Sequence, residues 1–241
     1  MARLEGDVLK ITDLEKHQID DMFKLFSEYY DNVTQSKFVS DLMEKDWVVL
    51  LKDGLSGQIR GFSTQMLLSS EIDGVAIKAI FSGDTIIHKD FWGEPTLARI
   101  WLNTFIQLAQ KHKDVKLYWF LISMGYRTYR FLPVYFKNFY PRYDQKTPEF
   151  DQKVLDAFAA QKYPKEYDPQ TGIIKHAILK EKLKSGVADV SEAKLRNPHV
   201  EYFFKRNLEF LDGDELACLT LIEENNLKSI AFRVMGKGTT R

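Results

Sequence analysis

Two side chains in the segment 75–88 are suited to proton transfer. The segment alternates in polarity like a β-strand, but Ser82-Gly83-Asp84 interrupts the pattern before Thr85-Ile86-Ile87-His88 resumes it. A glycine inside a strand pattern predicts a bulge, and bulges often turn side chains toward functional sites. Asp84 is therefore a candidate base, and His88, whose ordinary pKa is about 6.5, is a second. The alternative for Asp84 is a bulge residue that bonds its own backbone, and the alternative for His88 is a solvated residue at the end of the strand.

A second cluster lies in the segment Tyr126-Arg127-Thr128-Tyr129-Arg130, where rings alternate with guanidinium groups. On a helix, Arg127 and Arg130 are three residues apart and share a face. Arginines among aromatic rings can hold a phosphate, a carboxylate or a stacked base. The alternative interpretation is a solvated basic face.

The strands that would position these residues are predicted from alternation and turn signals. We expect strands at 7–11, 47–51, 58–68, 75–88 and 115–121, and a late strand at Lys228–Met235. The acidic, turn-like segment 207–215 either lines the path of a basic substrate or connects two elements.

Helices are predicted from apolar spacing and end signals. Thr12 and Glu15 have the spacing of a capping box, and Pro95 suits the first position of a later helix. Pro133 is expected to kink or divide a helix at 126–138. The other predicted helices are at 35–45, 149–161 and 199–207.

Composition limits the class of protein. The chain has 241 residues, and its 34 Lys and Arg balance 34 Asp and Glu, which argues against a nucleic-acid or anionic-membrane partner. Cys218 is the only cysteine and has apolar neighbours, so we expect an inert packed thiol and a cytoplasmic protein. The five histidines, His176 among them, show no paired spacing, so no metal site is expected.

The order of these elements resembles the Gcn5-related N-acetyltransferase (GNAT) fold over about residues 7–143. The resemblance implies an α/β protein with a mixed, mostly antiparallel central sheet flanked by helices. Its core would be residues 1–143, and residues 144–241 would be a mainly helical C-terminal extension packed on that core. In the family, the bulged strand diverges from the next one, and the pantetheine arm of acetyl-CoA lies between them. Residues 75–88 and 115–121 would be those strands.

The resemblance also implies where a coenzyme would bind. The family's pyrophosphate loop has the pattern Gln/Arg-x-x-Gly-x-Gly/Ala at a helix start, where free amides stabilise phosphate. In Asp90-Phe91-Trp92-Gly93-Glu94-Pro95 only the glycine matches. Arg127 and Arg130 would then take over phosphate binding. The residues that the resemblance assigns to the coenzyme are Ile86, Ile87, Gly93, Glu94, Thr96, Arg127 and Arg130.

A tyrosine in the family's late helix often protonates the departing thiolate, within a Tyr-x-x-x-Gly-Phe-like sequence. Here Tyr135 and Tyr140 match that pattern, while Phe139 occupies the glycine position. Tyr135 is the candidate acid on this resemblance. The alternative is a core tyrosine with its hydroxyl at the rim.

The resemblance implies an acyl-CoA-dependent N-acyltransferase that acts on a small amine or an amino-acid-like substrate. Asp84 or His88 would be the base, Tyr135 the acid, and acetyl-CoA or another acyl-CoA the co-substrate. The C-terminal extension would cap the cleft. One alternative takes the acyl group from a carrier protein, and another is a non-catalytic GNAT-like binding module. A homodimer is a candidate assembly.

Overall fold

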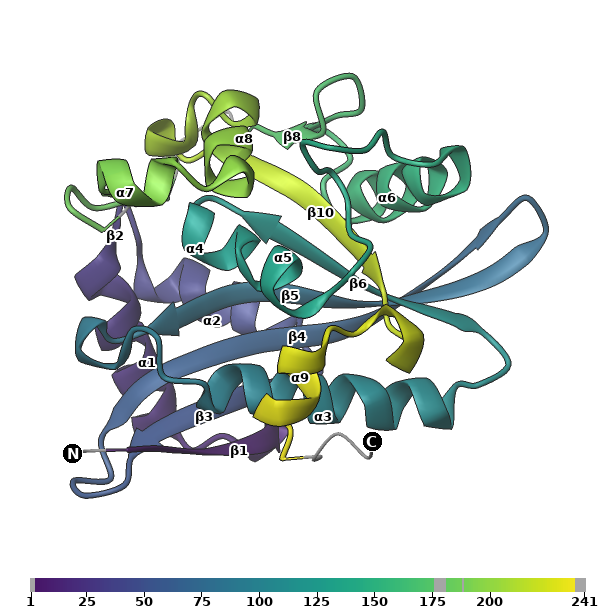
Figure 1. Cartoon of the computed structure of the whole chain (residues 1–241). Coiled ribbons are helices and arrows are strands. Elements are labelled where there is room, and N and C mark those ends of the chain that lie inside the picture. Colours follow the sequence, from purple (N-terminus) through teal and green to yellow (C-terminus); the bar gives the residue numbers. More distant parts are fainter. Residues whose placement is uncertain (1–2, 176–180, 188, 237–241) are drawn as a thin grey trace.

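The central feature of the computed structural model, which describes residues 3–175, 181–187 and 189–236, is a mixed β-sheet (Figure 1). Within those residues it has eight strands in the order β1-β3-β4-β5-β6-β10-β8-β7. Neighbouring strands are antiparallel except β5 and β6, which are parallel. The strands are β1 (Leu4–Lys10), β3 (Trp47–Asp53), β4 (Ile59–Ile72), β5 (Val75–Ile87), β6 (Lys116–Ser123), β7 (Tyr167–Asp168), β8 (Ile173–Ile174) and β10 (Glu215–Leu221).

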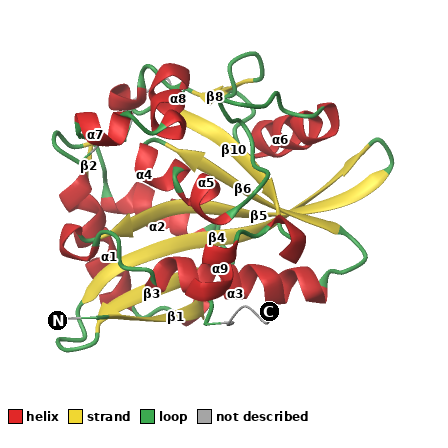
Figure 2. Cartoon of the chain, viewed as in Figure 1, coloured by secondary structure: helices red, strands yellow, loops and turns green. Residues whose placement is uncertain are grey.

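Helices cover both faces of the sheet, as Figure 2 shows. The helices are α1 (Lys16–Tyr29), α2 (Gln35–Met43), α3 (Thr96–Lys111), α4 (Tyr126–Tyr129), α5 (Phe131–Tyr135), α6 (Glu149–Lys162), α7 (Glu192–Leu195), α8 (Pro198–Arg206) and α9 (Ser229–Val234). A separate short ladder joins β2 (Tyr30–Asp31) to β9 (Lys182–Leu183). Within the described part of the chain, no helix is both long and apolar enough to cross a membrane.

The alternation of side chains along β6 explains why the sheet needs cover on both faces. Trp119 and Leu121 belong to a core cluster with α3, α5 and α8, whereas Tyr118 and Phe120 belong to another with α6. Successive residues of a strand point to opposite faces, so a strand that is apolar throughout must be covered on both faces of the sheet. A third cluster packs α1 and α2 against β3 and β4.

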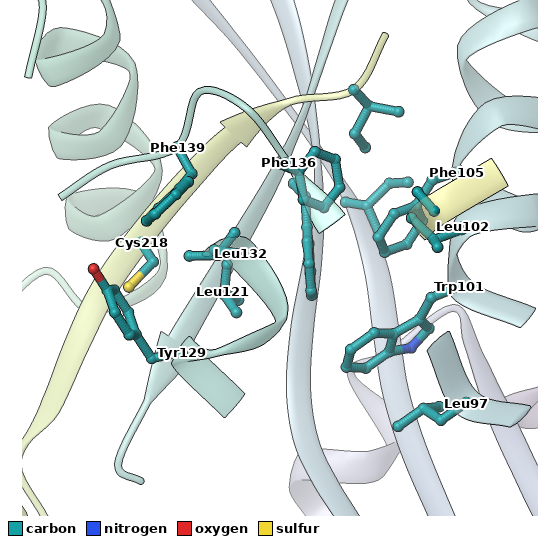
Figure 3. Packing of buried hydrophobic residues seen from close by; sticks show 14 of the residues in the cluster. Leu97, Trp101, Leu102, Phe105, Leu121, Tyr129, Leu132, Phe136, Phe139 and Cys218 are labelled. Atoms are coloured by element: carbon teal, nitrogen blue, oxygen red, sulfur yellow. The ribbon is translucent and has the colours of Figure 1, made fainter. Parts of the chain in front are cut away.

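The largest cluster is rich in aromatic rings (Figure 3). Trp101 packs edge-to-face on Trp119 with ring centroids 5.0 Å apart, and Phe105 lies 5.1 Å from Trp119. Each ring is 1% exposed. Edge-to-face pairs add about 0.5–1.5 kcal/mol beyond the burial of their area. Cys218 is fully buried in the same cluster, and burial raises the pKa of its thiol, which agrees with the predicted packed thiol.

Most of the elements predicted from the sequence are present. The mixed, mostly antiparallel sheet is confirmed, as are the strands predicted at 7–11, 47–51, 58–68, 75–88 and 115–121. The predicted division of the helix at 126–138 is also confirmed, because α4 ends at Tyr129 and α5 begins at Phe131.

Several predictions about element ends and the late strand are wrong. Glu15, not Thr12, caps α1, and its side chain forms a capping box with Gln18. Pro95 is the N-cap of α3 and not its first helical residue. The segment predicted as a late strand is helix α9, because Ala231 and Met235, four residues apart, lie together in the core cluster.

The true late strand is β10, which follows the acidic segment 207–215. It lies between β6 and β8 and pairs with β6 over Leu216–Leu221. Short apolar runs do not distinguish a strand from a buried helix, so the sequence pattern alone was ambiguous here. The C-terminal segment thus adds three strands, β10, β8 and β7, to the central sheet in addition to its helices.

Candidate active site

A β-bulge in β5 lies at the centre of the candidate site. Ser63 of β4 faces Thr85, and Gln65 faces Ser82, so Gly83 and Asp84 together oppose the single residue Thr64. A side chain on Gly83 would meet the Thr64 Oγ1 at 2.8 Å. The bulge therefore requires glycine at 83, and it places Asp84 in the wall of a cavity, as the sequence pattern predicted.

The strands β5 and β6 are paired only up to the bulge. Their parallel register runs from Ile77 opposite Lys116 to Ser82 opposite Leu121. Beyond this point β5 continues to Ile87 with no pairing to β6 in the described register, and Figure 1 shows the two ribbons diverging. This is the divergence of strands that the GNAT resemblance implied.

Two cavities open where the strands separate, and they share part of their walls. The shared lining residues are Tyr30, Thr85, Gly125 and Thr128. The larger cavity has a volume of about 430 Å³ and the smaller one about 110 Å³. The two cavities therefore adjoin each other along these four residues, and we call this place the junction.

The larger cavity is strongly polar. Four lysines and six carboxylates line it: Lys37, Lys45, Lys162, Lys165, Asp41, Glu44, Asp84, Glu166, Glu181 and Glu215. Three ion pairs use some of these groups: Lys162 and Lys45 both pair with Glu44, and Lys37 lies 3.3 Å from Glu181. The lining comes from α2, β5 and the C-terminal extension, which supplies Glu166, Glu181 and Glu215 among others.

The environment of Asp84 suits a general base at neutral pH. Burial raises the pKa of Asp84 from 3.8 to about 7, and the Lys45 ammonium opposes this rise. The carboxylates of Glu181, Asp41 and Glu215 favour the protonated form further. The Lys45 Nζ donates to the Asp41 carbonyl at 2.7 Å, and burial lowers the pKa of Lys45. A carboxyl group that titrates near pH 7 can accept a proton during catalysis.

The smaller cavity is mainly apolar and lies along the end of β5 that pairs with β4 but not with β6. Its lining includes Ile86 and Ile87 from that strand, Phe131 from α5, and Arg127 from α4. Trp92 closes another side, and its indole Nε1 donates to the Ile87 carbonyl at 2.8 Å. The Arg127 guanidinium carbon lies 3.9 Å from the centre of the Trp92 ring.

The start of α3 is already bonded to a carboxylate of the chain itself. The Thr96 backbone N–H donates to the Glu94 Oε2 at 2.8 Å, and the Thr96 hydroxyl donates to the Glu94 Oε1 at 2.7 Å. Glu94 and Thr96, which were predicted to contact a coenzyme, are thus paired with each other. Gly93 has a φ of +94°, a conformation that favours glycine, and it lines neither cavity.

The structure brings four of the predicted site residues to the cavities. Asp84 lines the larger one, and Ile86, Ile87 and Arg127 line the smaller one. Arg130 is exposed and lines neither cavity.

His88 and Tyr135 were predicted as catalytic residues, and neither lines these cavities. The His88 Nδ1 accepts from the Asp90 backbone N–H at 3.3 Å, so His88 caps the short 3-10 helix Lys89–Phe91. Tyr135 packs against Phe131, and its carbonyl accepts from the Lys228 N–H at 2.9 Å. Tyr135 is partly buried and packs against the largest core cluster, while Phe131, on which it stacks, lines the smaller cavity.

Sequence reasoning missed Tyr30, Lys45, Tyr163 and Glu181 as lining residues. Tyr30 reaches both cavities, and burial raises the pKa of its hydroxyl, as do the carboxylates of Asp84 and Glu215. Glu215 ends the acidic segment 207–215, which the sequence left open between a substrate path and a connector. Its place in the larger cavity favours the first of these interpretations.

No metal centre is defined by the described residues, since none of them form a group of three or more His, Cys, Asp or Glu that could hold an ion. His176, one of the histidines considered above, lies outside the described residues.

Comparisons with known proteins give matches only among solved structures. No family model matches the sequence, and no curated protein matches it. A conserved protein of unknown function from Enterococcus faecalis, described as a probable N-acyltransferase, is 16% identical with a TM-score of 0.41. That match covers 65% of this chain and 43% of the other, so it spans less than half of the Enterococcus chain.

Two further matches are of similar strength. A GNAT family N-acetyltransferase from Escherichia coli, in complex with CoA, is 12% identical with a TM-score of 0.39, covering 54% of this chain and 68% of that one. A glucosamine-6-phosphate N-acetyltransferase from Arabidopsis thaliana is 17% identical with a TM-score of 0.35, covering 48% and 81%. The bulged strand and the parallel pair that opens beside it are the two features of the sheet that the GNAT resemblance implied.

Proposed function

We propose that the protein is an N-acyltransferase that moves an acyl group from a pantetheine thioester to a small amine. The observation that carries this proposal is Asp84, a carboxyl group with a pKa of about 7 in a strand bulge beside the junction of two cavities. Perturbed pKa values in a cleft are typical of functional sites. The smaller, apolar cavity suits the pantetheine arm of acetyl-CoA or another acyl-CoA, and the larger, charged cavity suits the amine.

In the proposed reaction, the nitrogen of the neutral amine, after its ammonium form has lost one proton to solvent, attacks the thioester carbonyl at the junction. A carbon–nitrogen bond forms, the carbon–sulfur bond breaks, and the proton lost by the nitrogen passes to Asp84. Tyr30 lines both cavities and retains its proton at neutral pH because burial raises its pKa. Its hydroxyl is therefore the proposed hydrogen-bond donor to the leaving sulfur, in place of Tyr135.

The charges of the larger cavity support an acceptor that is polar and carries an ammonium group. Six carboxylates face four lysines there, so a cation is favoured over an anion. A volume of about 430 Å³ is in the range of small-molecule sites. An amino-acid-like amine is one of the acceptors that this lining suits, since Lys165 also lines the cavity and takes part in none of the ion pairs described above.

The test is the rate of acyl transfer by Asp84→Asn. With a panel of small amines and acetyl-CoA, we expect kcat to fall by roughly 10²- to 10⁴-fold, the usual contribution of a general base. In the wild type, kcat/KM should fall as the pH drops below about 7, because Asp84 is then protonated. His88→Gln is the matched control and should retain its rate. An unchanged rate in Asp84→Asn would exclude the mechanism, and no turnover by the wild type with any donor would favour the binding module.

A further inference from the structure

We propose that the acyl donor is recognised by a single phosphate, through Arg127, and that the nucleotide half of coenzyme A is not bound at the start of α3. The donor chemistry is then a 4′-phosphopantetheine thioester, carried either by a protein or by free coenzyme A. This inference rests on the proposed function, since it identifies the donor of that reaction.

The first observation is that the start of α3 has little space for a pyrophosphate and already holds the Glu94 carboxylate, beside the Arg99 guanidinium, whose Nη2 lies 3.5 Å from the Thr96 Oγ1. The N-terminus of a helix attracts phosphate when its backbone N–H groups are open. Here the Glu94 carboxylate accepts from the Thr96 N–H, and Pro95 has no N–H to offer. Thr96, Leu97 and Ala98 are 1%, 1% and 2% exposed. The Thr96 hydroxyl also lies 3.3 Å from the Leu4 carbonyl, which places β1 against this turn.

The second observation is a cation with an unused donor in the wall of the smaller cavity. Arg127 stacks on Trp92, and among the described residues its buried Nε has no hydrogen-bond partner. Leaving a buried donor without an acceptor is unfavourable. The rest of the guanidinium lines the smaller cavity, where its charge can pair with an anion. A guanidinium group forms strong charge-assisted hydrogen bonds with phosphate.

The lining of the smaller cavity connects this cation to the reaction centre. It includes Thr85 at the junction, then Ile86 and Ile87 along β5, and finally Trp92, whose indole is bonded to the Ile87 carbonyl. A donor with its thioester at the junction and its arm along β5 would bring its phosphate to Arg127. A second phosphate would have to bind elsewhere, and Glu94 repels it from α3.

Binding of unreactive thioether analogues tests this directly and without an acceptor amine. The analogues are those of acetyl-CoA, acetyl-phosphopantetheine and acetyl-pantetheine, measured by calorimetry on the full chain. We expect the first two to bind within about threefold of each other, and the third to bind roughly 10- to 100-fold more weakly, as for one charge-assisted contact. Arg127→Gln should abolish the difference between the second and third. Arg130→Gln removes the same charge from the exposed neighbour and should leave it unchanged.

The outcomes separate this inference from the function on which it rests. Binding of the coenzyme A analogue tenfold or more tightly than the phosphopantetheine analogue would overturn the single-phosphate model while leaving acyl transfer intact. Equal binding of the phosphopantetheine and pantetheine analogues would also overturn the single-phosphate model and leave acyl transfer intact. If none of the three binds and no donor is turned over, the proposed function fails as well. An acyl carrier protein assayed beside acyl-CoA identifies the source of the donor, and either source agrees with recognition of one phosphate.

Discussion

Asp84 should make the folded protein less stable as the pH rises, and Asp84→Asn should remove that effect. The pKa of Asp84 rises from 3.8 to about 7 on folding because the carboxyl is buried. An acid whose pKa is raised on folding favours the folded state at low pH. That favourable contribution is lost as the pH rises from the unfolded value of 3.8 to the folded value of about 7.

The magnitude follows from the difference between the two pKa values. Each pKa unit corresponds to about 1.4 kcal/mol, so ionised Asp84 costs the folded state about 4 kcal/mol above pH 7. Asparagine cannot ionise, so Asp84→Asn should be more stable than the wild type at pH 8. Between pH 5 and pH 8 the advantage of the variant in the free energy of unfolding should grow by about 2.5 kcal/mol.

Urea denaturation of both proteins at pH 5 and pH 8 measures this change. Comparing the two proteins at each pH cancels the other titrating groups, which they share. Asp21→Asn changes an exposed carboxylate on α1 and serves as the control. Its difference from the wild type in the free energy of unfolding should be the same at pH 5 and pH 8. An equal difference at the two pH values would refute the buried, raised-pKa account of Asp84.

Two further predictions concern the bulge and the junction. Gly83→Ala should lower the free energy of unfolding by about 1–3 kcal/mol, because the added Cβ would lie 2.8 Å from the Thr64 Oγ1. Urea denaturation measures this, and adding Thr64→Ala should restore part of the loss; no rescue would show that this contact is not the cause. Tyr30→Phe should lower kcat by roughly tenfold or more with little change in donor binding, since only the hydroxyl is removed. A larger loss in Tyr135→Phe than in Tyr30→Phe would reverse the assignment of the donor to the leaving sulfur.

The bulge could be predicted from the sequence because its signal is local. Gly83 interrupts an otherwise regular alternation, and this interruption predicts the bulge. The bulge in turn places the neighbouring Asp84 in the wall of the larger cavity. The partners of Asp84 could not be predicted in the same way. Lys45 follows α2, Glu181 precedes β9 and Glu215 begins β10, so only the tertiary fold brings them together.

His88 and Tyr135 show why position in a pattern is a weaker guide than geometry. Both were chosen by their places relative to strands and helices. His88 caps a 3-10 helix that the sequence did not indicate, and Tyr135 stacks on Phe131 while its carbonyl accepts from the Lys228 N–H, just before α9. No local pattern marks Tyr30 as a site residue. In the sequence it continues the apolar spacing of the helix that ends at Tyr29.

The position of β10 has a consequence for how the protein acquires activity. Glu215 is both a wall of the larger cavity and the first residue of this strand, and Leu216 beside it pairs with Ser123 of β6. These residues are more than ninety positions apart in the sequence. Pairing over such separations is slow to form. A chain that has completed β1 to β6 but not docked β10 would present β6 as an open, apolar edge prone to aggregation and would lack a complete acceptor cavity. The larger cavity should therefore be complete only after β10 has docked against β6.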